Sequence, residues 1–180
     1  MKLFITRHGQ TNMNVARLVC GTCPAHLTEK GQKQANELAR TLKEEQHINK
    51  IEYIYVSDLE RARQTAAPIE KALGLTAIVD PRLQEVNFGD MEEVSYDDPD
   101  FLKRKEELFY RYPNGESQIE VAHRLFSIID EVKEERKGHN VLFVSHGSAT
   151  RLMRSYFLDL TTDQYKQKPM DNCHLICFDL

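Results

Sequence analysis

Lys2-Leu3-Phe4-Ile5-Thr6-Arg7-His8-Gly9 and Asn140-Val141-Leu142-Phe143-Val144-Ser145-His146-Gly147 share one pattern, although they stand in different halves of the chain. In each, an apolar run typical of a buried β-strand leads directly into a His-Gly pair. The carboxyl ends of the strands of an open parallel sheet face one crevice, where ligands bind. We therefore expect the two histidines to meet over one substrate, with a glycine after each to leave room for it. Imidazole acts as a nucleophile or a proton carrier near neutral pH.

The rest of the chain alternates strand-like and helical patterns. Further apolar runs typical of strands cover residues 51–56, 75–79 and 175–178. Helical spacing of apolar residues runs from Thr28 or Glu29 to about Gln46, and returns at 58–74, after Ser117, and from 147 to 158. This alternation predicts an α/β fold, specifically a three-layer α/β/α sandwich with a mostly parallel central sheet.

Three segments carry more detailed expectations. Residues 81–88 should be extended, and the charged segment 97–112 is expected to form a surface helix. Ser117 and Glu120 have the spacing of a capping box, which marks a helix start. The apolar stripe expected on that helix consists of Ile119, Ala122, Leu125, Phe126, Ile129 and Val132.

Length and charge limit the possible partners. The chain has 180 residues, which fits one domain over residues 1–180. Its formal net charge is −4, and the sequence contains no run of basic residues that could form a nucleic-acid site. We therefore expect no nucleic-acid partner. No apolar run approaches the ~18 residues of a membrane span, and the N-terminus lacks the apolar core of a signal peptide. We expect a cytoplasmic protein with no membrane partner, and the oligomeric state stays open.

The four cysteines allow two interpretations. Cys20 and Cys23 have the C-x-x-C spacing of zinc and redox sites, and Cys173 and Cys177 could add ligands. Packing on one face of a strand explains Cys173 and Cys177 adequately, so we expect no metal site. A reversible disulfide between Cys20 and Cys23 stays open.

Arginines accompany the first histidine and the strand at 51–56. Arg7 offers a rigid fork of donors suited to phosphate or carboxylate, and Asn14 could return toward the site as a neutral donor. In the helix that follows Ser57, Arg61 or Arg63 could reach an anion near the free N–H groups of the first turn. The alternatives are a polar strand end for Arg7 and a solvated helix face for the other two, above all for Arg63.

Glu85 is the candidate proton donor. It lies between apolar residues near the break at Gly89. A phosphate dianion favours the protonated form of a neighbouring carboxyl group, which suits a general acid that protonates a leaving oxygen. An exposed glutamate in an irregular loop is the alternative.

Together these segments resemble the histidine phosphatase superfamily, also called the phosphoglycerate mutase-like family. The order and spacing of the matching residues cover nearly the whole chain. They are Arg7-His8-Gly9 with Asn14, Leu27-Thr28, Gly31, Gln34-Ala35, Ser57, Leu59, Arg61-Ala62, Gln64-Thr65-Ala66, Glu85, Phe88-Gly89, Pro113, Gly115-Glu116-Ser117 and Ser145-His146-Gly147.

The resemblance implies a mechanism that needs no metal and no cofactor. His8 would attack phosphorus and become a phosphohistidine, while Arg7, Arg61 and His146 would bind the phosphate oxygens. Glu85 would protonate the leaving alkoxide and then take a proton from the attacking water. The remaining contacts to the substrate are expected from Asn14, from the backbone near Cys20 and Gly21, and from Gly147 after the second histidine.

Three departures from the family pattern stand out. Gln10 replaces the usual glutamate after His-Gly, His26 replaces a proline, and Glu93 replaces a glycine, which puts a tight turn at Glu93 in doubt. None of the proposed catalytic positions is lost.

In the family that the chain resembles, mutases carry a longer insertion after the acidic residue, which excludes water while the phosphoryl group is returned to the substrate. Here the stretch from Glu85 to Pro113 is short and mostly charged, so we expect a phosphomonoesterase acting on a small phosphorylated metabolite. Small broad-specificity phosphatases and α-ribazole phosphatases resemble the chain best. The alternatives are a phosphoglycerate mutase-type phosphotransferase and a non-catalytic module that binds phosphorylated ligands. Substrate choice should lie in residues 90–112, whose basic and aromatic side chains are Lys103, Arg104, Lys105, Phe109, Tyr110 and Arg111.

Overall fold

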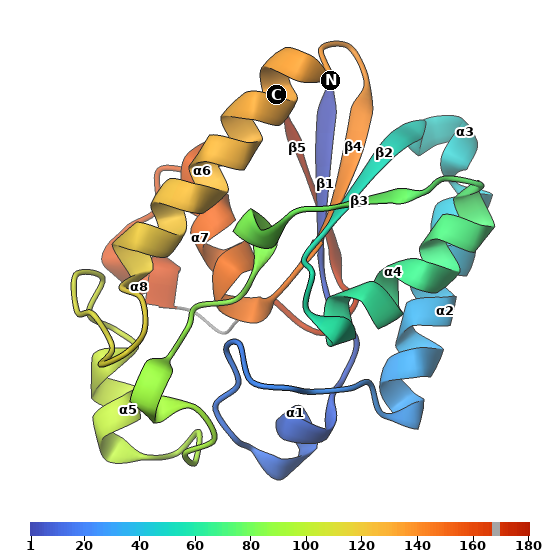
Figure 1. Ribbon diagram of the computed structural model, residues 1–180. Coiled ribbons are helices and arrows are strands. Elements are labelled where there is room, and N and C mark those ends of the chain that lie inside the picture. The colour runs from blue at the N-terminus through green and yellow to red at the C-terminus, as the bar shows by residue number, and fades with distance from the viewer. Residues whose placement is uncertain (167–169) are drawn as a thin grey trace.

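The computed structural model of the chain describes residues 1–166 and 170–180, and its centre is one sheet (Figure 1). The strands lie in the order β3-β2-β4-β1-β5, and only β5 at the edge runs antiparallel to its neighbour. Their bounds are β1 Lys2–Arg7, β2 Ile51–Val56, β3 Ala77–Val79, β4 Asn140–Ser145 and β5 Leu175–Asp179. The mostly parallel sheet expected from the sequence is confirmed.

The register of the three middle strands decides where the site forms. β1 and β4 are parallel neighbours with Arg7 opposite Ser145, and the His8 N–H donates to the Ser145 carbonyl at 3.0 Å. On the other side of β4, the Ser57 N–H that follows β2 donates to the Val144 carbonyl at 3.1 Å. All three strands therefore end at one level, each with a polar side chain directly after it.

Two helices cover one face of the sheet. α2 (Glu29–Glu44) and α4 (Glu60–Leu73) pack against each other there (Figure 1). Thr28 begins α2, because its side chain accepts the N–H of Gly31, and Gly74 ends α4 at a φ of 69°, which glycine adopts at little cost. Their buried apolar stripes include Leu38, Leu42, Ala62, Ala66 and Ile69.

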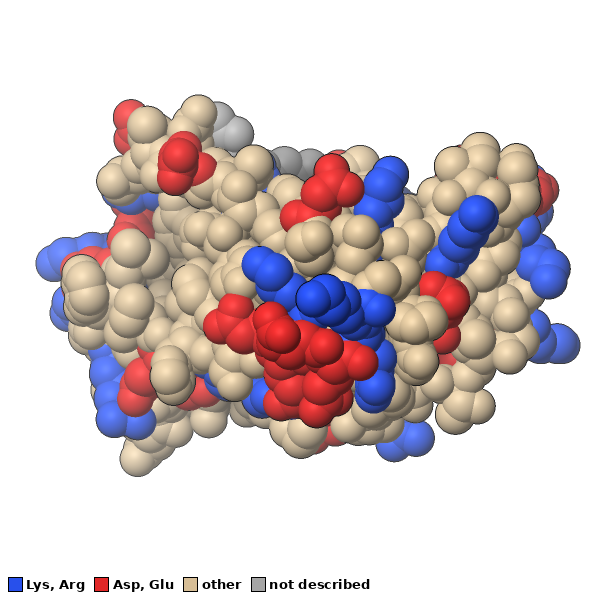
Figure 2. Space-filling model, turned by 90° about the horizontal axis from the view of Figure 1, so that it is seen from above, with Lys and Arg blue, Asp and Glu red and all other residues tan. Residues whose placement is uncertain are grey.

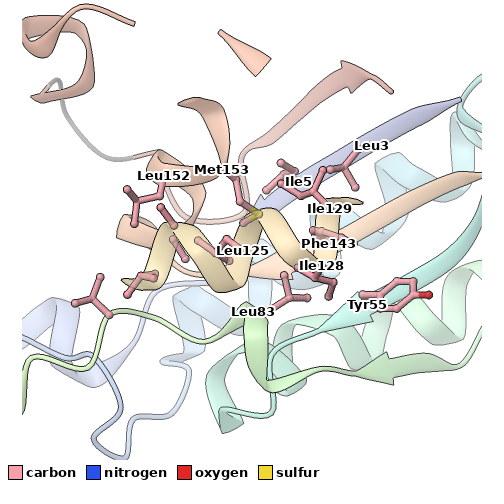
Figure 3. Packing of buried hydrophobic residues seen from close by; sticks show 14 of the residues in the cluster. Leu3, Ile5, Tyr55, Leu83, Leu125, Ile128, Ile129, Phe143, Leu152 and Met153 are labelled. Carbon is pink, nitrogen blue, oxygen red and sulfur yellow. The ribbon is translucent and has the colours of Figure 1, made fainter. Parts of the chain in front are cut away.

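The opposite face is covered by α6 (Gln118–Glu135) and α7 (Gly147–Phe157). Figure 3 shows Leu125, Ile128 and Ile129 of α6 over the apolar side chains of the sheet. The capping box of Ser117 and Glu120 at the start of α6 is present as expected. With helices on both faces, the three-layer α/β/α arrangement is confirmed.

The segments between these elements differ from expectation. Residues 81–88 begin with a 3-10 turn over Pro81–Leu83, and the surface helix expected over 97–112 is only Pro99–Arg104. This helix lies on the surface as expected, except that its Phe101 is buried against the cavity described below. The stripe of α6 was also partly wrong, since Ile119 is 50% exposed. The short elements that the sequence did not indicate are α1 Asn12–Ala16, α3 Gln46–Asn49, α8 Thr162–Lys166 and the 3-10 turn Gly89–Met91.

The turn at Glu93 forms although the family's glycine is absent. Glu93 adopts a φ of 64°, a left-handed conformation that costs a non-glycine residue about 1–2 kcal/mol. Its N–H donates to the Val19 carbonyl and the Val94 carbonyl accepts the N–H of Val19, which holds the turn in place.

The surface at the end of the molecule that carries both chain termini is shown in Figure 2. Basic side chains on this face lie beside acidic ones rather than forming a continuous patch. Arg82 illustrates this, since it pairs with both Asp80 and Glu131. None of the helices in the described parts of the chain is long and apolar enough to cross a membrane.

Candidate active site

The two histidines meet as the sequence predicted. Their ring centroids lie 5.2 Å apart with the planes inclined by 59°, and both side chains are buried. The contact follows from the register of β1 and β4, because each histidine is the first residue after its strand. The loop after β1 also lies tightly on the first turn of α2, where a Cβ on Gly9 would meet the Gly31 carbonyl at 2.5 Å.

The His8 ring is held in the tautomer that a nucleophile requires. Its Nδ1 lies 2.7 Å from the carbonyl of Gly9, which can only accept, so Nδ1 carries the proton of the neutral ring. Nε2 then keeps its lone pair, and no described residue forms a hydrogen bond with it. Burial, together with the charges of Arg61 and Arg7, lowers the pKa of His8 well below its usual value of 6.5. The ring is therefore neutral at physiological pH, and it lines the cavity.

His146 contacts the His8 ring and does not itself line the cavity. Its Nδ1 accepts from Nε of Arg61 at 3.2 Å, and its Nε2 lies 2.8 Å from Oγ of Ser57. Burial and the neighbouring Arg61 lower the pKa of His146 well below 6.5, so it is also neutral. Both ring nitrogens are thus engaged with the protein, and His146 itself is fully buried.

Arg61 is the arginine of α4 that reaches the site. Besides contacting His146, it donates from Nη1 to the Cys23 carbonyl at 3.3 Å and from Nη2 to the Gly21 carbonyl at 2.5 Å. It is 2% exposed, lines the cavity and forms no ion pair with a carboxylate in the described chain. Arg63 does not line the cavity and lies on the outer side of α4, as the alternative interpretation supposed.

Arg7 brings a second guanidinium to the cavity. Its Nη1 donates to the Met170 carbonyl at 2.8 Å, whereas its Nε is buried without a hydrogen-bond partner among the described residues. A Cβ on Gly147 would lie 3.3 Å from Cζ of Arg7, so the glycine gives the guanidinium room above the start of α7. A buried, unpartnered donor beside a helix N-terminus is an arrangement that favours a bound anion.

Glu85 is held against the same helix terminus. One carboxylate oxygen accepts the N–H of Ser148 at 2.8 Å, and the other accepts the N–H groups of Ala149 at 3.0 Å and of Val86 at 2.9 Å. The side chain is 6% exposed and lines the cavity. The expected proton donor therefore lies in the cavity wall, and it also caps α7.

The substrate-binding residues expected from the resemblance divide into two groups. Asn14, Cys20 and Gly147 line the cavity. The Oδ1 of Asn14 accepts the Thr11 N–H, and its Nδ2 donates to no described residue, so a donor is available to a ligand. Gly21 does not line the cavity, because its carbonyl accepts from Arg61 and its N–H donates to the carboxylate of Glu92 at 2.8 Å.

Glu92 is a site residue that sequence reasoning missed. Its carboxylate accepts the N–H groups of Gly21, Thr22 and Phe88, which ties the loop containing Cys20 to the segment after Glu85. A Cβ on Gly21 would lie 1.9 Å from the Val86 carbonyl, so the two segments meet without space for a side chain.

Cys20 and Cys23 lie side by side as free thiols, with 3.0 Å between their sulfur atoms. Burial raises the pKa of the Cys20 thiol, and burial together with the contact between the two thiols raises that of Cys23. The described residues include no group of three or more histidine, cysteine or acidic side chains arranged to hold a metal ion.

The cavity over His8 is small, with about 90 Å³ of space that the centre of a water molecule can reach. Of the basic and aromatic residues that the sequence indicated in 90–112, only Lys105 lines it. His26 is exposed and lies outside it. The other lining residues that sequence reasoning missed are Thr11, Leu18, Val19, Val86, Phe88, Tyr96, Phe101, Gln118, Ser148 and Arg151.

Comparison with known proteins gives one consistent family. The profile of the histidine phosphatase superfamily (branch 1) matches residues 3–180. A probable phosphoglycerate mutase, GpmB, of Yersinia pestis is 34% identical over 182 residues, covering 97% of this chain and 83% of the relative. The chain therefore belongs to the histidine phosphatase superfamily.

Solved structures agree with this assignment. A mycobacterial glucosyl-3-phosphoglycerate phosphatase in complex with VO3 is similar at a TM-score of 0.87 and 28% identity, covering 98% of this chain and 91% of that one. The α-ribazole phosphatase of Shigella flexneri is similar at a TM-score of 0.83 and 26% identity, covering 100% and 91%. The similar proteins thus include phosphatases as well as a probable mutase.

Proposed function

We propose that the protein is a metal-independent phosphomonoesterase that hydrolyses small phosphorylated metabolites through a phosphohistidine on His8. The observation that carries this proposal is the neutral His8 ring, whose Nε2 forms no hydrogen bond with a described residue and which lines a cavity together with Arg7 and Arg61. A nucleophile placed beside two cations suits attack on an anionic phosphoryl group, because the cations stabilise the charge of the transition state.

In the first step, the lone pair of His8 Nε2 forms a bond to phosphorus as the bond from phosphorus to the ester oxygen breaks. The buried Nε of Arg7 and the guanidinium of Arg61 supply donors to the phosphoryl oxygens, and Nδ2 of Asn14 adds a neutral one. His146 is assigned to positioning, since it fixes Arg61 and packs on His8. A contact from His146 to phosphate would require it to give up one of its two hydrogen bonds.

Glu85 is assigned the proton transfers. Its protonated carboxyl gives a proton to the leaving alkoxide, and the resulting carboxylate then takes a proton from water as that water attacks phosphorus and breaks the bond to His8. Each turnover thus consumes one water and releases the alcohol and phosphate. The position of Glu85 in the cavity wall supports this assignment, and the N–H groups of α7 keep its carboxylate in place.

Mutase activity is the second candidate, because the relative GpmB is named a probable phosphoglycerate mutase. A mutase must return the phosphoryl group to the substrate before water takes it. The segment between Glu85 and Pro113 lines one side of the cavity and is short, and we take this as favouring hydrolysis over return of the phosphoryl group.

The test is phosphate release from p-nitrophenyl phosphate, sugar phosphates, nucleotides, α-ribazole phosphate and 3-phosphoglycerate in the presence of a chelator. Wild type is compared with His8→Ala and with His123→Ala, which removes an exposed histidine of α6. Release that is lost only in His8→Ala supports the proposal. Release that survives in His8→Ala refutes the assigned nucleophile, and isomerisation of phosphoglycerate dependent on a bisphosphoglycerate primer would establish the mutase.

A further inference from the structure

The charge of the cavity exceeds what one phosphate group can neutralise. Its charged lining residues are four cations and one carboxylate, namely Arg7, Arg61, Lys105, Arg151 and Glu85. With His8 neutral, the lining has a formal charge of +3. A phosphomonoester brings about two negative charges at neutral pH, which leaves about one positive charge without a counterpart.

Two of the four cations lie outside the catalytic group. Lys105 follows α5 (Pro99–Arg104), and its Nζ lies 4.5 Å from the ring centroid of Tyr96 and 5.9 Å from that of Phe101. The guanidinium of Arg151 lies 4.6 Å from the ring centroid of Tyr165. Aromatic faces thus hold both cations, and neither forms an ion pair with a carboxylate in the described parts of the chain. Cations held in this way keep their charge available to a ligand.

Arg151 also has an unused donor. Its Nε is buried and has no hydrogen-bond partner among the described residues, as is true of Nε of Arg7. A buried donor without a partner costs free energy, and this cost is removed when an acceptor binds. Nε of Arg104 is also buried without a hydrogen-bond partner, but the guanidinium of Arg104 pairs with Asp100 and Glu107, whereas that of Arg151 pairs with no carboxylate in the described parts of the chain.

One buried side chain connects the two cations. Gln118 is 2% exposed, and its Nε2 donates to the Lys105 carbonyl at 2.6 Å. Its Oε1 accepts from the hydroxyl of Tyr165, whose ring lies under Arg151. Gln118 therefore fixes both cations relative to each other, and it lines the same cavity.

The distance from the phosphate site suits a group on the same small molecule. Arg151 lies on α7 one turn after Gly147 and Ser148, where Glu85 and Arg7 meet the helix. One helical turn is about 5.4 Å long. A group that Arg151 binds would therefore lie only a few bonds from the ester oxygen.

We propose that Lys105 and Arg151 form a second anion site, so that the preferred substrate is a phosphomonoester whose alcohol carries a further carboxylate or phosphate group. This inference rests on the proposed phosphatase function and names its substrate class. The two residues recognise the alcohol part of the substrate, and Gln118 is a positioning residue that acts through them.

The test uses substrates that differ only in the second anionic group. 3-Phosphoglycerate has a carboxylate where glycerol 3-phosphate has a neutral hydroxymethyl group. Fructose 1,6-bisphosphate and fructose 6-phosphate differ in the same way by a phosphate. A charged hydrogen bond supports a preference of about 10- to 100-fold in kcat/KM for the anionic member of a pair. The pair with the larger preference identifies the second group as carboxylate or phosphate.

Variants then test whether Lys105 and Arg151 cause the preference for the substrate with the second anionic group. Lys105→Gln and Arg151→Gln should each reduce it at least severalfold, mainly through a higher KM for the anionic substrate. Lys103→Gln and Arg154→Gln are matched controls on α5 and α7 that do not line this cavity, and they should keep it. Gln118→Ala should raise KM for the anionic substrate more than it lowers kcat. Thermal unfolding of each variant shows whether its fold is kept.

The outcomes separate this inference from the function on which it rests. Release that depends on His8 but shows no preference for either anionic substrate would overturn the second site and leave the phosphatase intact. A preference that persists in both Lys105→Gln and Arg151→Gln, or that falls equally in the controls, would also overturn it. No release from any ester would refute the phosphatase, and the second site with it.

Discussion

A single carbonyl decides how His8 can react. Because the Gly9 carbonyl accepts from Nδ1, the lone pair of the neutral ring lies on Nε2, and the His8 side chain lines the cavity. Burial and two guanidinium groups keep the ring neutral by lowering its pKa. His146 is kept neutral in the same way, but hydrogen bonds to Arg61 and Ser57 engage both of its nitrogens. The two histidines look alike in the sequence, yet only one is available as a nucleophile.

These environments predict the titration of both rings. Histidine ring resonances followed by NMR as a function of pH should include two with midpoints well below 6.5, each missing in the His8→Ala or the His146→Ala variant. A midpoint at or above 6.5 for His8 would show that its ring is not held neutral.

The same shifts predict how stability depends on pH. Below pH 6.5 the unfolded chain binds protons at these two positions that the folded protein does not, so the free energy of unfolding falls as pH is lowered through and below 6.5. The slope is about 1.4 kcal/mol per pH unit for each ring. Denaturant unfolding at pH 7.5 and 5.5 should therefore show a smaller loss for His8→Ala than for wild type, and an equal loss would contradict the assignment.

At the scale of elements, the start of α7 carries much of the site. His146 is the residue directly before the helix, Gly147 leaves room for Arg7, and the N–H groups of Ser148 and Ala149 donate to Glu85. The partial positive charge of the helix N-terminus therefore lies beside both the carboxylate and the cavity. One helix terminus thus orients the carboxylate to which we assign the proton transfers, and it adds to the field that attracts an anion.

Replacing Glu85 separates its two roles. Glu85→Gln keeps an acceptor for the α7 N–H groups but has no proton to give, so kcat/KM for alkyl phosphates should fall about 10²- to 10⁴-fold. The loss should be much smaller for p-nitrophenyl phosphate, whose leaving group needs little protonation. The free energy of unfolding should fall by about 1 kcal/mol or less. Equal losses for both kinds of ester would show that Glu85 is not the general acid.

Over the whole molecule, the sequence predicts best the site residues whose positions follow from where a strand ends. The α/β/α layers are recognisable from apolar periodicity, Arg7 is the last residue of a strand, and His8 and His146 directly follow one. Lys105 could not be distinguished from the other basic residues of 90–112, because the inward packing of Phe101 selects it. Arg151 and Gln118 lie within helices, where the spacing of apolar residues gives no indication that their polar side chains face a cavity.

The layered core can be tested at α6. Leu125 is fully buried between this helix and the sheet, so Leu125→Ala should lower the free energy of unfolding by about 2–5 kcal/mol through lost burial and a residual cavity (Figure 3). Ile119→Ala on the same helix is the control, since Ile119 is half exposed and its loss should cost under about 1 kcal/mol. Similar costs for the two variants in denaturant unfolding would contradict the described packing.

The central claim is the covalent intermediate on His8, and rapid-quench trapping of the phosphoenzyme tests it most directly. The Glu85→Gln variant is mixed with p-nitrophenyl phosphate that carries a radioactive phosphoryl group. The p-nitrophenolate leaves without being protonated, so the phosphoenzyme can still form. Its hydrolysis lacks the base Glu85, so the phosphoenzyme should accumulate. The enzyme is quenched in alkali and digested. We predict an acid-labile, base-stable label on the peptide that contains His8 and none in a variant that also carries His8→Ala. Label on another residue, or turnover that continues without His8, would contradict the account.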